Sequence, residues 1–408
     1  MGANIGGRPV AATTAMSPGK HPGGRTPVPE VDRPYPSAFP CGGQILKAAV
    51  LYKAGEPLRV EEVRMDPPKN GEVLIRIGAA GICASDHHVM QGTASFPLPI
   101  VLGHEGAGTV EQVGPGVSRV KPGDRCILSF APSCGWCHYC RTGMGQLCAT
   151  HRATGSRMFD NTVRLHAGKE DLFQMQKLGV FAEQAVVPQE ACFPIPAKVP
   201  MEVAALIGCC VTTGVGALIN RHGVEAGATV AVFGCGGVGL NVIQGARLLS
   251  AAKVIAVDIH DHKLEFAYRF GATHIVNGKR EDAVEAIRRV TGGGADFAVD
   301  SFGSQVTTGQ AIKAIKTGGT ALIVGLAAAG ETVPVDMVDL VRNQKTVVGN
   351  YYGGVSPQET FGKLVDFYLA GKVDVEGLIT RSYPLEKINE GFEALARGED
   401  GRGVLVFK

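Results

Sequence analysis

Four closely spaced cysteines are the residues here with the clearest chemistry. They follow the pattern Cys-x2-Cys-x2-Cys-x7-Cys and are Cys134, Cys137, Cys140 and Cys148. Four thiolates at such spacing can surround one zinc ion tetrahedrally, at about 2.3 Å each. Turn-forming glycines at 135, 143 and 145 let the backbone curl around the ion. Because all four positions of the ion are filled by protein, this pattern predicts a structural zinc site.

Two other uses of these cysteines are weaker. Disulfide pairing suits secreted proteins, and this chain has no charged-then-apolar leader. Iron–sulfur clusters use related spacings, but those commonly have a remote fourth cysteine or a Cys-Pro ending, whereas Cys148 precedes Ala149. The spacing therefore favours zinc.

Three further segments could hold a second metal ion. Cys83, the pair His104-Glu105, and Cys209 each lie in a glycine-flanked corner rather than in a periodic apolar stripe. Two thiolates and one imidazole leave one coordination position open, as in catalytic zinc sites. Each residue taken alone is more often a packing residue, and spacing by itself does not join residues 83, 104 and 209.

A glycine fingerprint begins at residue 234. The stretch Gly234-Cys235-Gly236-Gly237-Val238-Gly239 fits Gly-x-Gly-x-x-Gly, directly after a strand-like run and at the start of a helical one. Gly234 permits a tight turn, Gly236 lets a pyrophosphate approach the backbone, and Gly239 allows close helix–strand packing. Asp258 ends the next strand-like run, where a carboxylate binds the ribose hydroxyls and repels a 2′-phosphate, so NAD is predicted over NADP. Lys263 could assist at the ribose or be a solvated helix residue.

Bulk composition excludes several classes of protein. The chain has 408 residues, 45% hydrophobic and 19% charged, with a formal charge of +2. It offers no basic stripe for nucleic acid, and no run approaches the roughly 18 apolar residues that span a bilayer. Residues 1–43 are rich in Pro, Gly, Ala and Thr and are expected to form a disordered or strap-like tail. The lack of a leader predicts a cytoplasmic protein.

The remaining sequence changes texture near residue 211. Strand-like runs lie at 47–52, 73–77, 101–117, 121–128 and 184–188, and the polar segment 149–180 is predicted to be a long irregular loop. Beyond residue 211, short apolar strands alternate with amphipathic helices, which predicts a parallel sheet covered on both faces. The closing run 404–407 is expected to return to the first part of the chain.

Taken together, these motifs resemble those of the zinc-dependent alcohol dehydrogenases of the medium-chain dehydrogenase/reductase (MDR) family. The resemblance extends over roughly residues 46–408 and implies an α/β fold of two domains. A GroES-like β-rich catalytic domain would comprise residues 44–210 and 352–408, with the structural zinc lobe at about 130–150. A Rossmann doubly wound parallel-sheet coenzyme domain would comprise residues 211–351.

The resemblance also implies roles for individual residues. Cys83, His104 and Cys209 would hold a catalytic zinc, with Glu105 behind it, and Cys210 competes with Cys209 for the third position. Asp86 would orient His104, while Ser85 and His88 would carry the alcohol proton to solvent. Zinc would polarise the alcohol while hydride passes to the nicotinamide of NAD. Further implied cofactor contacts are Thr213, Val238, Val324 and Leu326 at the nicotinamide, and Arg402 at the pyrophosphate.

The implied substrate pocket favours a hydrophobic primary or secondary alcohol. It would be lined by Ala94, Phe96, Phe130 and Leu326. An S-(hydroxymethyl)glutathione or formaldehyde dehydrogenase is the alternative: Arg152 resembles its glutathione-binding arginine, but Ala94 and Phe96 replace the usual acidic residues. Ala84 replaces a basic residue that many relatives place against the pyrophosphate. A non-catalytic NAD- and zinc-binding protein is a third reading, and the expected assembly is a homodimer, with a homotetramer as the alternative.

Overall fold

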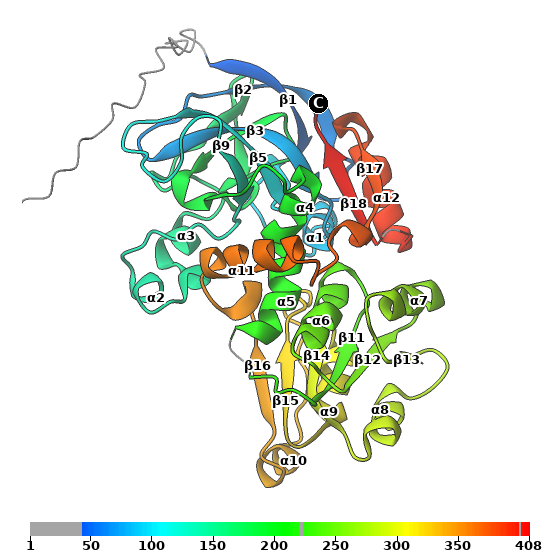
Figure 1. Cartoon of the computed structure of the whole chain (residues 1–408). Helices are drawn as coiled ribbons and strands as arrows, with labels where there is room; N and C mark the ends of the chain where they lie inside the picture. Colours follow the sequence, from blue (N-terminus) through cyan, green and yellow to red (C-terminus); the bar gives the residue numbers. More distant parts are fainter. Residues whose placement is uncertain (1–42, 221–222, 400) are drawn as a thin grey trace, which may run out of the picture. The chain divides into compact units, whose positions relative to one another are not determined.

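A parallel sheet forms the part of the fold that follows residue 228. The computed structural model describes residues 43–220, 223–399 and 401–408. Six parallel strands lie in the order β13-β12-β11-β14-β15-β16 (Figure 1). Their bounds are β11 (Thr229–Phe233), β12 (Lys253–Asp258), β13 (His274–Asn277), β14 (Ala295–Asp300), β15 (Ile315–Ile323) and β16 (Thr346–Gly349). This is the order of a doubly wound dinucleotide-binding sheet, in which the strand order reverses between β11 and β14.

Helices cover both faces of this sheet. They are α6 (Gly237–Leu248), α7 (Asp261–Arg269), α8 (Ala283–Thr291), α9 (Gln305–Ala314) and α10 (Met337–Arg342). Val230 and Val232 of β11 belong to one apolar core, while Ala231 and Phe233 belong to another on the opposite face. The predicted burial of both faces is therefore confirmed, because successive side chains of a strand point to opposite sides.

The other part of the fold is rich in antiparallel strands. A closed barrel consists of β1 (Gln44–Leu51), β2 (Arg59–Met65), β7 (Leu165–Ala167), β8 (Glu170–Gln174) and β4 (Ile100–Val101). A second sheet has the order β10 (Cys192–Pro194), β6 (Arg125–Leu128), β5 (Gly106–Val113), β3 (Glu72–Gly81), β18 (Arg402–Val406) and β17 (Ile379–Tyr383), with β9 (Gln184–Pro188) also paired to β3. Val404 of β18 lies opposite Gly81 of β3, so the C-terminal strand returns to a sheet built mainly from the first part of the chain, as the sequence predicted.

Helices connect and cover these sheets. They are α1 (Ala84–Met90), α2 (His138–Arg141), α3 (Ala149–Thr154), α4 (Met201–Leu206), the π-helix η4 (Ile207–Val211), α5 (Thr212–Ile219), α11 (Pro357–Leu369) and α12 (Ile388–Arg397). Contrary to the expectation from sequence, the continuous segment Met201–Ile219 is long and apolar enough to cross a membrane. In this fold 83% of its most apolar stretch is buried, so it serves as a core helix.

The segment 149–180 is not the irregular loop that its polarity predicted. It contributes α3, β7 and β8, and the last two pair within the barrel. Arg164, which is fully buried, donates to both carboxylate oxygens of Glu72 on β3 at 2.7 and 2.5 Å. Strands of three and five residues carry too few side chains to show a clear alternation, although Leu165 and Leu172 are buried in an apolar core.

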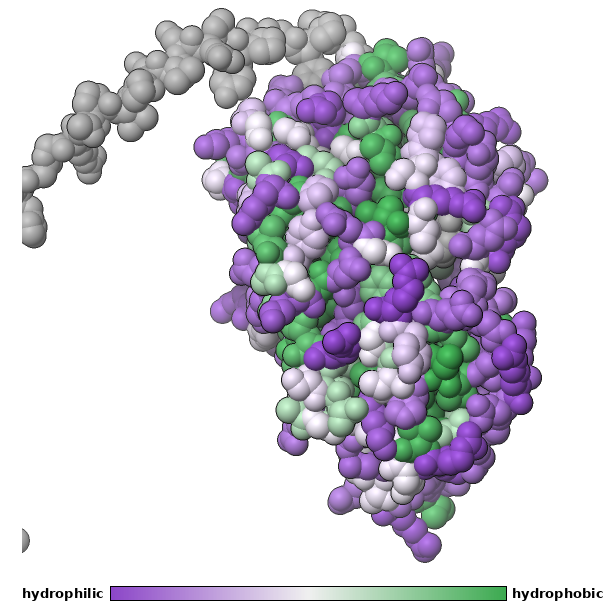
Figure 2. Space-filling view, turned by 45° about the vertical axis from the view of Figure 1, so that its right-hand side comes forward, coloured by the Kyte–Doolittle hydropathy of each residue, from purple (hydrophilic) through white to green (hydrophobic). Residues whose placement is uncertain are grey.

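Two predictions from the sequence are not tested by the structure. The predicted tail lies in residues that the structure does not describe, apart from Gly43. The described residues belong to one compact unit, so the division at residues 210 and 352 remains a proposal. On the face shown in Figure 2, hydrophilic side chains cover most of the surface, with apolar residues between them.

Candidate active site and metal centres

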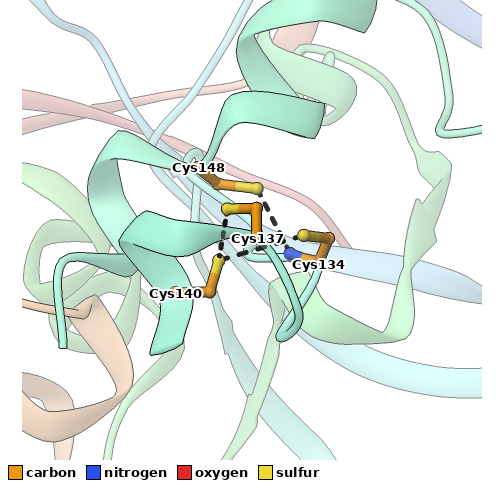
Figure 3. Close-up of side chains that lie close together, drawn as sticks. All are labelled: Cys134, Cys137, Cys140 and Cys148. Carbon is orange, nitrogen blue, oxygen red and sulfur yellow. Dashed lines mark hydrogen bonds between the residues drawn. The ribbon is translucent and has the colours of Figure 1, made fainter. Parts of the chain in front are cut away.

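The four cysteines of the lobe point toward one another (Figure 3). Their sulfur atoms all lie within 4.8 Å of one another, with 3.5 Å from Cys137 to Cys140 and 4.0 Å from Cys134 to Cys140. Zinc–sulfur bonds of about 2.3 Å in a tetrahedron require sulfur atoms roughly 3.8 Å apart. The donor chemistry and spacing therefore fit a zinc ion, and no position is left for a substrate.

Local backbone groups prepare these sulfur atoms for a metal. The Sγ of Cys148 accepts hydrogen bonds from the backbone N–H groups of Cys134 at 3.3 Å and His151 at 3.4 Å. The backbone N–H of Cys140 lowers the pKa of Cys137 to about 6. N–H donors of this kind favour the thiolate, which is the form that binds metal.

A second donor set forms from segments that are far apart in the sequence. Ligand atoms of Cys83, His104, Glu105 and Cys209 lie within 4.8 Å of one another, and all four residues are buried. Cys83 precedes α1, His104 and Glu105 join β4 to β5, and Cys209 lies in the π-helix η4. The structure thus brings residues 83, 104 and 209 together. Two sulfurs, one nitrogen and a nearby carboxylate suit a zinc ion that keeps one position open.

Buried partners orient His104 within this set. Its Nδ1 lies 3.2 and 3.1 Å from the two carboxylate oxygens of Asp86 on α1, and Asp86 also accepts the backbone N–H of Gly103 at 2.9 Å. Asp86 therefore fixes the ring and leaves Nε2 for a metal. A hydrogen bond from Cys209 holds the pKa of Cys83 well below its usual range, which favours the metal-binding thiolate form.

Glu105 lies behind the donor set and pairs with Arg402. Its carboxylate lies close against Gly81, where a Cβ would come within 2.2 Å of Oε2. Arg402 on β18 donates to that oxygen, and both side chains are buried. Burial raises the pKa of Glu105 to about 7, although Arg402 acts in the opposite direction. Oε1 of Glu105 and Nε of Arg402 are buried without a partner among the described residues.

Arg402 also lies against the glycine fingerprint. A Cβ on Gly237 would meet the Cδ of Arg402 at 2.6 Å and its Nη1 at 2.8 Å. One guanidinium thus lies between the carboxylate of the metal set and the fingerprint. The pyrophosphate contact that the sequence predicted for Arg402 stays a prediction.

The two neighbouring cysteines of the π-helix η4 have different partners. Cys209 belongs to the donor set, whereas the Sγ of Cys210 donates to the backbone oxygen of Leu206 at 3.6 Å. The buried hydroxyl of Tyr352 donates to the backbone oxygen of Gly208 and anchors this turn. π-Helical turns are often found at functional sites, and this one aims a ligand that an α-helix would place differently.

The glycine fingerprint lies beside the carboxyl end of β12. Gly234 has a φ of +90°, and a Cβ on Gly239 would lie 1.9 Å from the backbone oxygen of Gly234. At Gly236 a Cβ would meet nothing within 4 Å, so that position faces open space. Asp258 accepts backbone N–H groups of Cys235 at 2.8 Å and Ile259 at 2.7 Å, which places its carboxylate next to the fingerprint.

The other predicted cofactor residues vary in burial. Val324 is buried, Thr213, Val238 and Lys263 are half-buried, and Leu326 is 60% exposed. Ser85 and His88 are half-buried on α1, directly after Cys83. The exposed apolar side chains of Ile259 and Phe302, which lie beside Asp258 and Gly234, were not predicted from sequence.

Aromatic rings surround the second donor set. Phe130 lies edge-on to His104 with ring centres 5.4 Å apart and stacks on Tyr352 at 3.8 Å. The ring centre of Tyr351 lies 6.1 Å from that of Phe130. Tyr351 was not predicted from sequence, although the Tyr-Tyr-Gly-Gly stretch after the last parallel strand was an available signal. The predicted pocket residues Ala94 and Phe96 are half-buried and pack against the main core.

Family profiles match both parts of the chain. The family described as "Alcohol dehydrogenase GroES-like domain" matches residues 69–197, and the one described as "Zinc-binding dehydrogenase" matches residues 237–370. The chain is 42% identical over 367 residues to the NDMA-dependent alcohol dehydrogenase of Amycolatopsis methanolica, covering 88% of this chain and 98% of that protein. It is also 42% identical over 368 residues to the S-(hydroxymethyl)glutathione dehydrogenase of Saccharomyces cerevisiae, covering 88% and 95%.

Solved structures show the same fold. An alcohol dehydrogenase zinc-binding domain protein from Burkholderia ambifaria has a TM-score of 0.86 and 35% identity, covering 90% of this chain and 99% of that one. The benzyl alcohol dehydrogenase of Acinetobacter calcoaceticus has a TM-score of 0.85 and 31% identity, covering 90% and 100%. The predicted combination of a GroES-like domain and a Rossmann domain is confirmed.

Proposed function

Because this chain belongs to the zinc-dependent alcohol dehydrogenases of the MDR family, we propose that it reversibly oxidises a hydrophobic primary or secondary alcohol. It is an oxidoreductase whose cofactors are zinc and NAD(H). The observation that carries the proposal is the convergence of Cys83, His104 and Cys209 into one buried donor set.

Each metal would have its own residues. Cys83, His104 and Cys209 would hold the catalytic zinc, and the four cysteines of the lobe would hold the structural one. When bound, the catalytic zinc supplies Lewis-acid polarisation of the alcohol oxygen, and NAD accepts the hydride. Asp86 keeps His104 in the ligating tautomer, and Glu105 provides a carboxylate behind the set.

The chain's own residues would place the cofactor and move the proton. Asp258 would bind the adenosine ribose and disfavour a 2′-phosphate, with Lys263 beside it. Gly236 leaves room for the pyrophosphate, and Ile259 and Phe302 offer apolar surface beside that ribose site. Ser85 and His88, half-buried on α1 next to Cys83, would carry the alcohol proton outward.

An aromatic primary alcohol fits the surroundings of the donor set. Phe130 and Tyr351 place aromatic rings near His104, which favours an apolar, planar substrate. One structural neighbour, of 31% identity, is a benzyl alcohol dehydrogenase by name. Ala94, Phe96 and Leu326 would extend the apolar wall.

A second candidate reaction is the oxidation of S-(hydroxymethyl)glutathione. The yeast relative with that name is as similar as the alcohol dehydrogenase relative, at 42% identity. Arg152 is exposed on α3 and could bind a carboxylate. Formaldehyde turnover with and without glutathione separates the two candidates.

We also propose a homodimer, with a homotetramer as the alternative, in the cytoplasm. Strand β16 is at the edge of the parallel sheet, and exposed apolar side chains lie on it and on α10 nearby: Met337, Val338, Val341 and Val347. The cysteines that the structure describes are all free thiols, which suits a reducing compartment. Sedimentation velocity would measure the assembly, and a monomer would contradict it.

Metal analysis combined with a matched pair of variants tests the function. We expect two zinc ions per chain and NAD-dependent oxidation of benzyl alcohol, with NADP and NDMA assayed in parallel. Cys83→Ala should remove one zinc and the activity, whereas Cys210→Ala, a buried neighbour outside the donor set, should keep both. Full activity in Cys83→Ala would refute the proposal. Bound zinc and NAD without hydride transfer to any alcohol would instead indicate a non-catalytic binding protein.

A further inference from the structure

Lys177 is a buried cation close to the four-cysteine lobe. Its side chain is fully buried, and its Nζ donates to the backbone oxygens of Gly155 at 2.7 Å and His151 at 3.1 Å and to the ring Nδ1 of His151 at 3.2 Å. Three acceptors match the three N–H groups of an ammonium, whereas a neutral amine has only two. Among the residues that the structure describes, no carboxylate forms an ion pair with it.

His151 connects this ammonium to a cysteine of the lobe. Its ring is held on both sides, because Nδ1 accepts from Lys177 and Nε2 donates to the Oε1 of Gln176 at 3.1 Å. Its backbone N–H donates to the Sγ of Cys148, which caps the N-terminus of α3. At the other end of this short helix, Lys177 binds the carbonyl oxygens. Helix α3 therefore lies between the Sγ of Cys148 and the Nζ of Lys177, and a metal-bound thiolate at its start with an ammonium at its end is the arrangement that the helix dipole favours.

Backbone strain and burial both disfavour a charged Lys177 at this position. Gln176 and Lys177 both adopt left-handed backbone conformations, with φ of +54° and +64°, which are strained for residues other than glycine. Burial lowers the pKa of Lys177 to about 7, and the negative charge of Cys148 acts in the opposite direction. A buried cation without a carboxylate partner needs another source of negative charge. A zinc ion bound by four thiolates carries a net charge of about −2.

We propose that Lys177 is a positioning residue of the four-cysteine metal centre. Its ammonium offsets the negative charge of the metal and its thiolates, and through His151 it fixes the N–H group that hydrogen-bonds Cys148. This inference rests on the proposed assignment of zinc to the lobe. It gives a role to a buried lysine that the oxidation chemistry does not use.

The test measures zinc release from the full-length, zinc-loaded protein into a chromophoric chelator. The Cys83→Ala background, which lacks the catalytic zinc, isolates the lobe. We expect Lys177→Met to release the lobe zinc at least ten-fold faster than its parent. Lys177→Gly removes the ammonium while accepting the positive φ, so it should show the same acceleration even if Lys177→Met folds poorly. Lys169→Met, at an exposed lysine, should match the parent.

Cobalt substitution distinguishes this role from general stabilisation. The thiolate-to-cobalt charge-transfer band of the lobe should shift in Lys177→Met and Lys177→Gly but not in Lys169→Met. Release at the parental rate together with an unshifted band would overturn the inference while leaving the zinc assignment intact. A parent protein whose lobe holds no zinc would overturn both.

Discussion

The ion pair between Arg402 and Glu105 allows a test of how the metal set and the cofactor loop are connected. Arg402→Met would leave the fully buried carboxylate of Glu105 without its cation. Two unit charges about 4 Å apart at an effective dielectric constant of about 20 attract by roughly 4 kcal/mol. Loss of one partner of a buried pair costs about 3–5 kcal/mol, so we expect the free energy of unfolding to fall by that amount.

A double-mutant cycle separates the pair from the individual side chains. Glu105→Gln removes the stranded charge, so Arg402→Met/Glu105→Gln should recover about 1–3 kcal/mol relative to the sum of the single variants. Urea unfolding followed by circular dichroism gives the four free energies. Arg397→Met removes an exposed arginine that pairs with Glu399 at 2.6 Å, and should leave the free energy of unfolding nearly unchanged because solvent screens this pair.

The affinity for the cofactor should depend on Arg402 and not on Glu105. Its guanidinium lies against Gly237, and loss of a charge-assisted contact of about 1.5 kcal/mol weakens binding roughly ten-fold. The Kd for NADH, measured by fluorescence titration, should rise equally in Arg402→Met and in the double variant, and stay unchanged in Arg397→Met. Additive unfolding energies together with an unchanged Kd would refute this account of Arg402.

Three shorter predictions concern the cofactor site and acid stability. Gly236→Ala should keep the melting temperature of the parent, since its Cβ meets nothing within 4 Å, yet weaken NAD binding at least ten-fold in calorimetry. Gly239→Ala should unfold at a lower temperature, because its Cβ would lie 1.9 Å from the backbone oxygen of Gly234. Equal melting temperatures of the two variants would contradict this contrast. Asp258→Asn should lower the ratio of kcat/KM for NAD over NADP at least ten-fold, because the charge that repels a 2′-phosphate is removed; an unchanged ratio would assign the preference elsewhere. Burial disfavours the charge of Asp160, but the Thr162 hydroxyl and the Arg164 guanidinium that bond it hold its pKa well below the usual value. Its contribution is therefore complete above about pH 4 and is lost as the pH falls further. The difference in melting temperature between Asp160→Asn and the parent should be constant above about pH 4 and shrink below it; a difference that stays constant below about pH 4 would contradict this.

Local sequence patterns predicted the parallel sheet closely, but they did not predict the C-terminal helix of the part that is rich in antiparallel strands. The strand-like run before the glycine fingerprint is strand β11, and its pattern was recognisable because both of its faces are buried and apolar. Helix α12 was not predicted, although one face of the helix packs apolar residues into the core. Family motifs pointed to Cys83, His104 and Cys209, whereas spacing could not, since their meeting depends on three separate corners of the fold.

Long-range polar partners were the other gap. Arg402 was predicted to contact the cofactor, and its bond to Glu105 spans 297 residues, which no local pattern can show. Lys177 and Arg164 were not predicted either, because a lysine or arginine in a polar segment is ordinarily solvated. Buried charges become recognisable only when the strands that enclose them are known.

Strand β18 has a consequence for synthesis of the protein. Glu105 leaves the ribosome 297 residues before the arginine that neutralises it, an interval of roughly 15–60 s at about 5–20 residues per second. Until then residues 79–81 of β3 lack the neighbour that later pairs with them, while β5 and β9 are already available. A nascent chain therefore exposes an open strand edge beside an uncompensated carboxylate, and chaperones that shield such edges should raise the yield of folded protein.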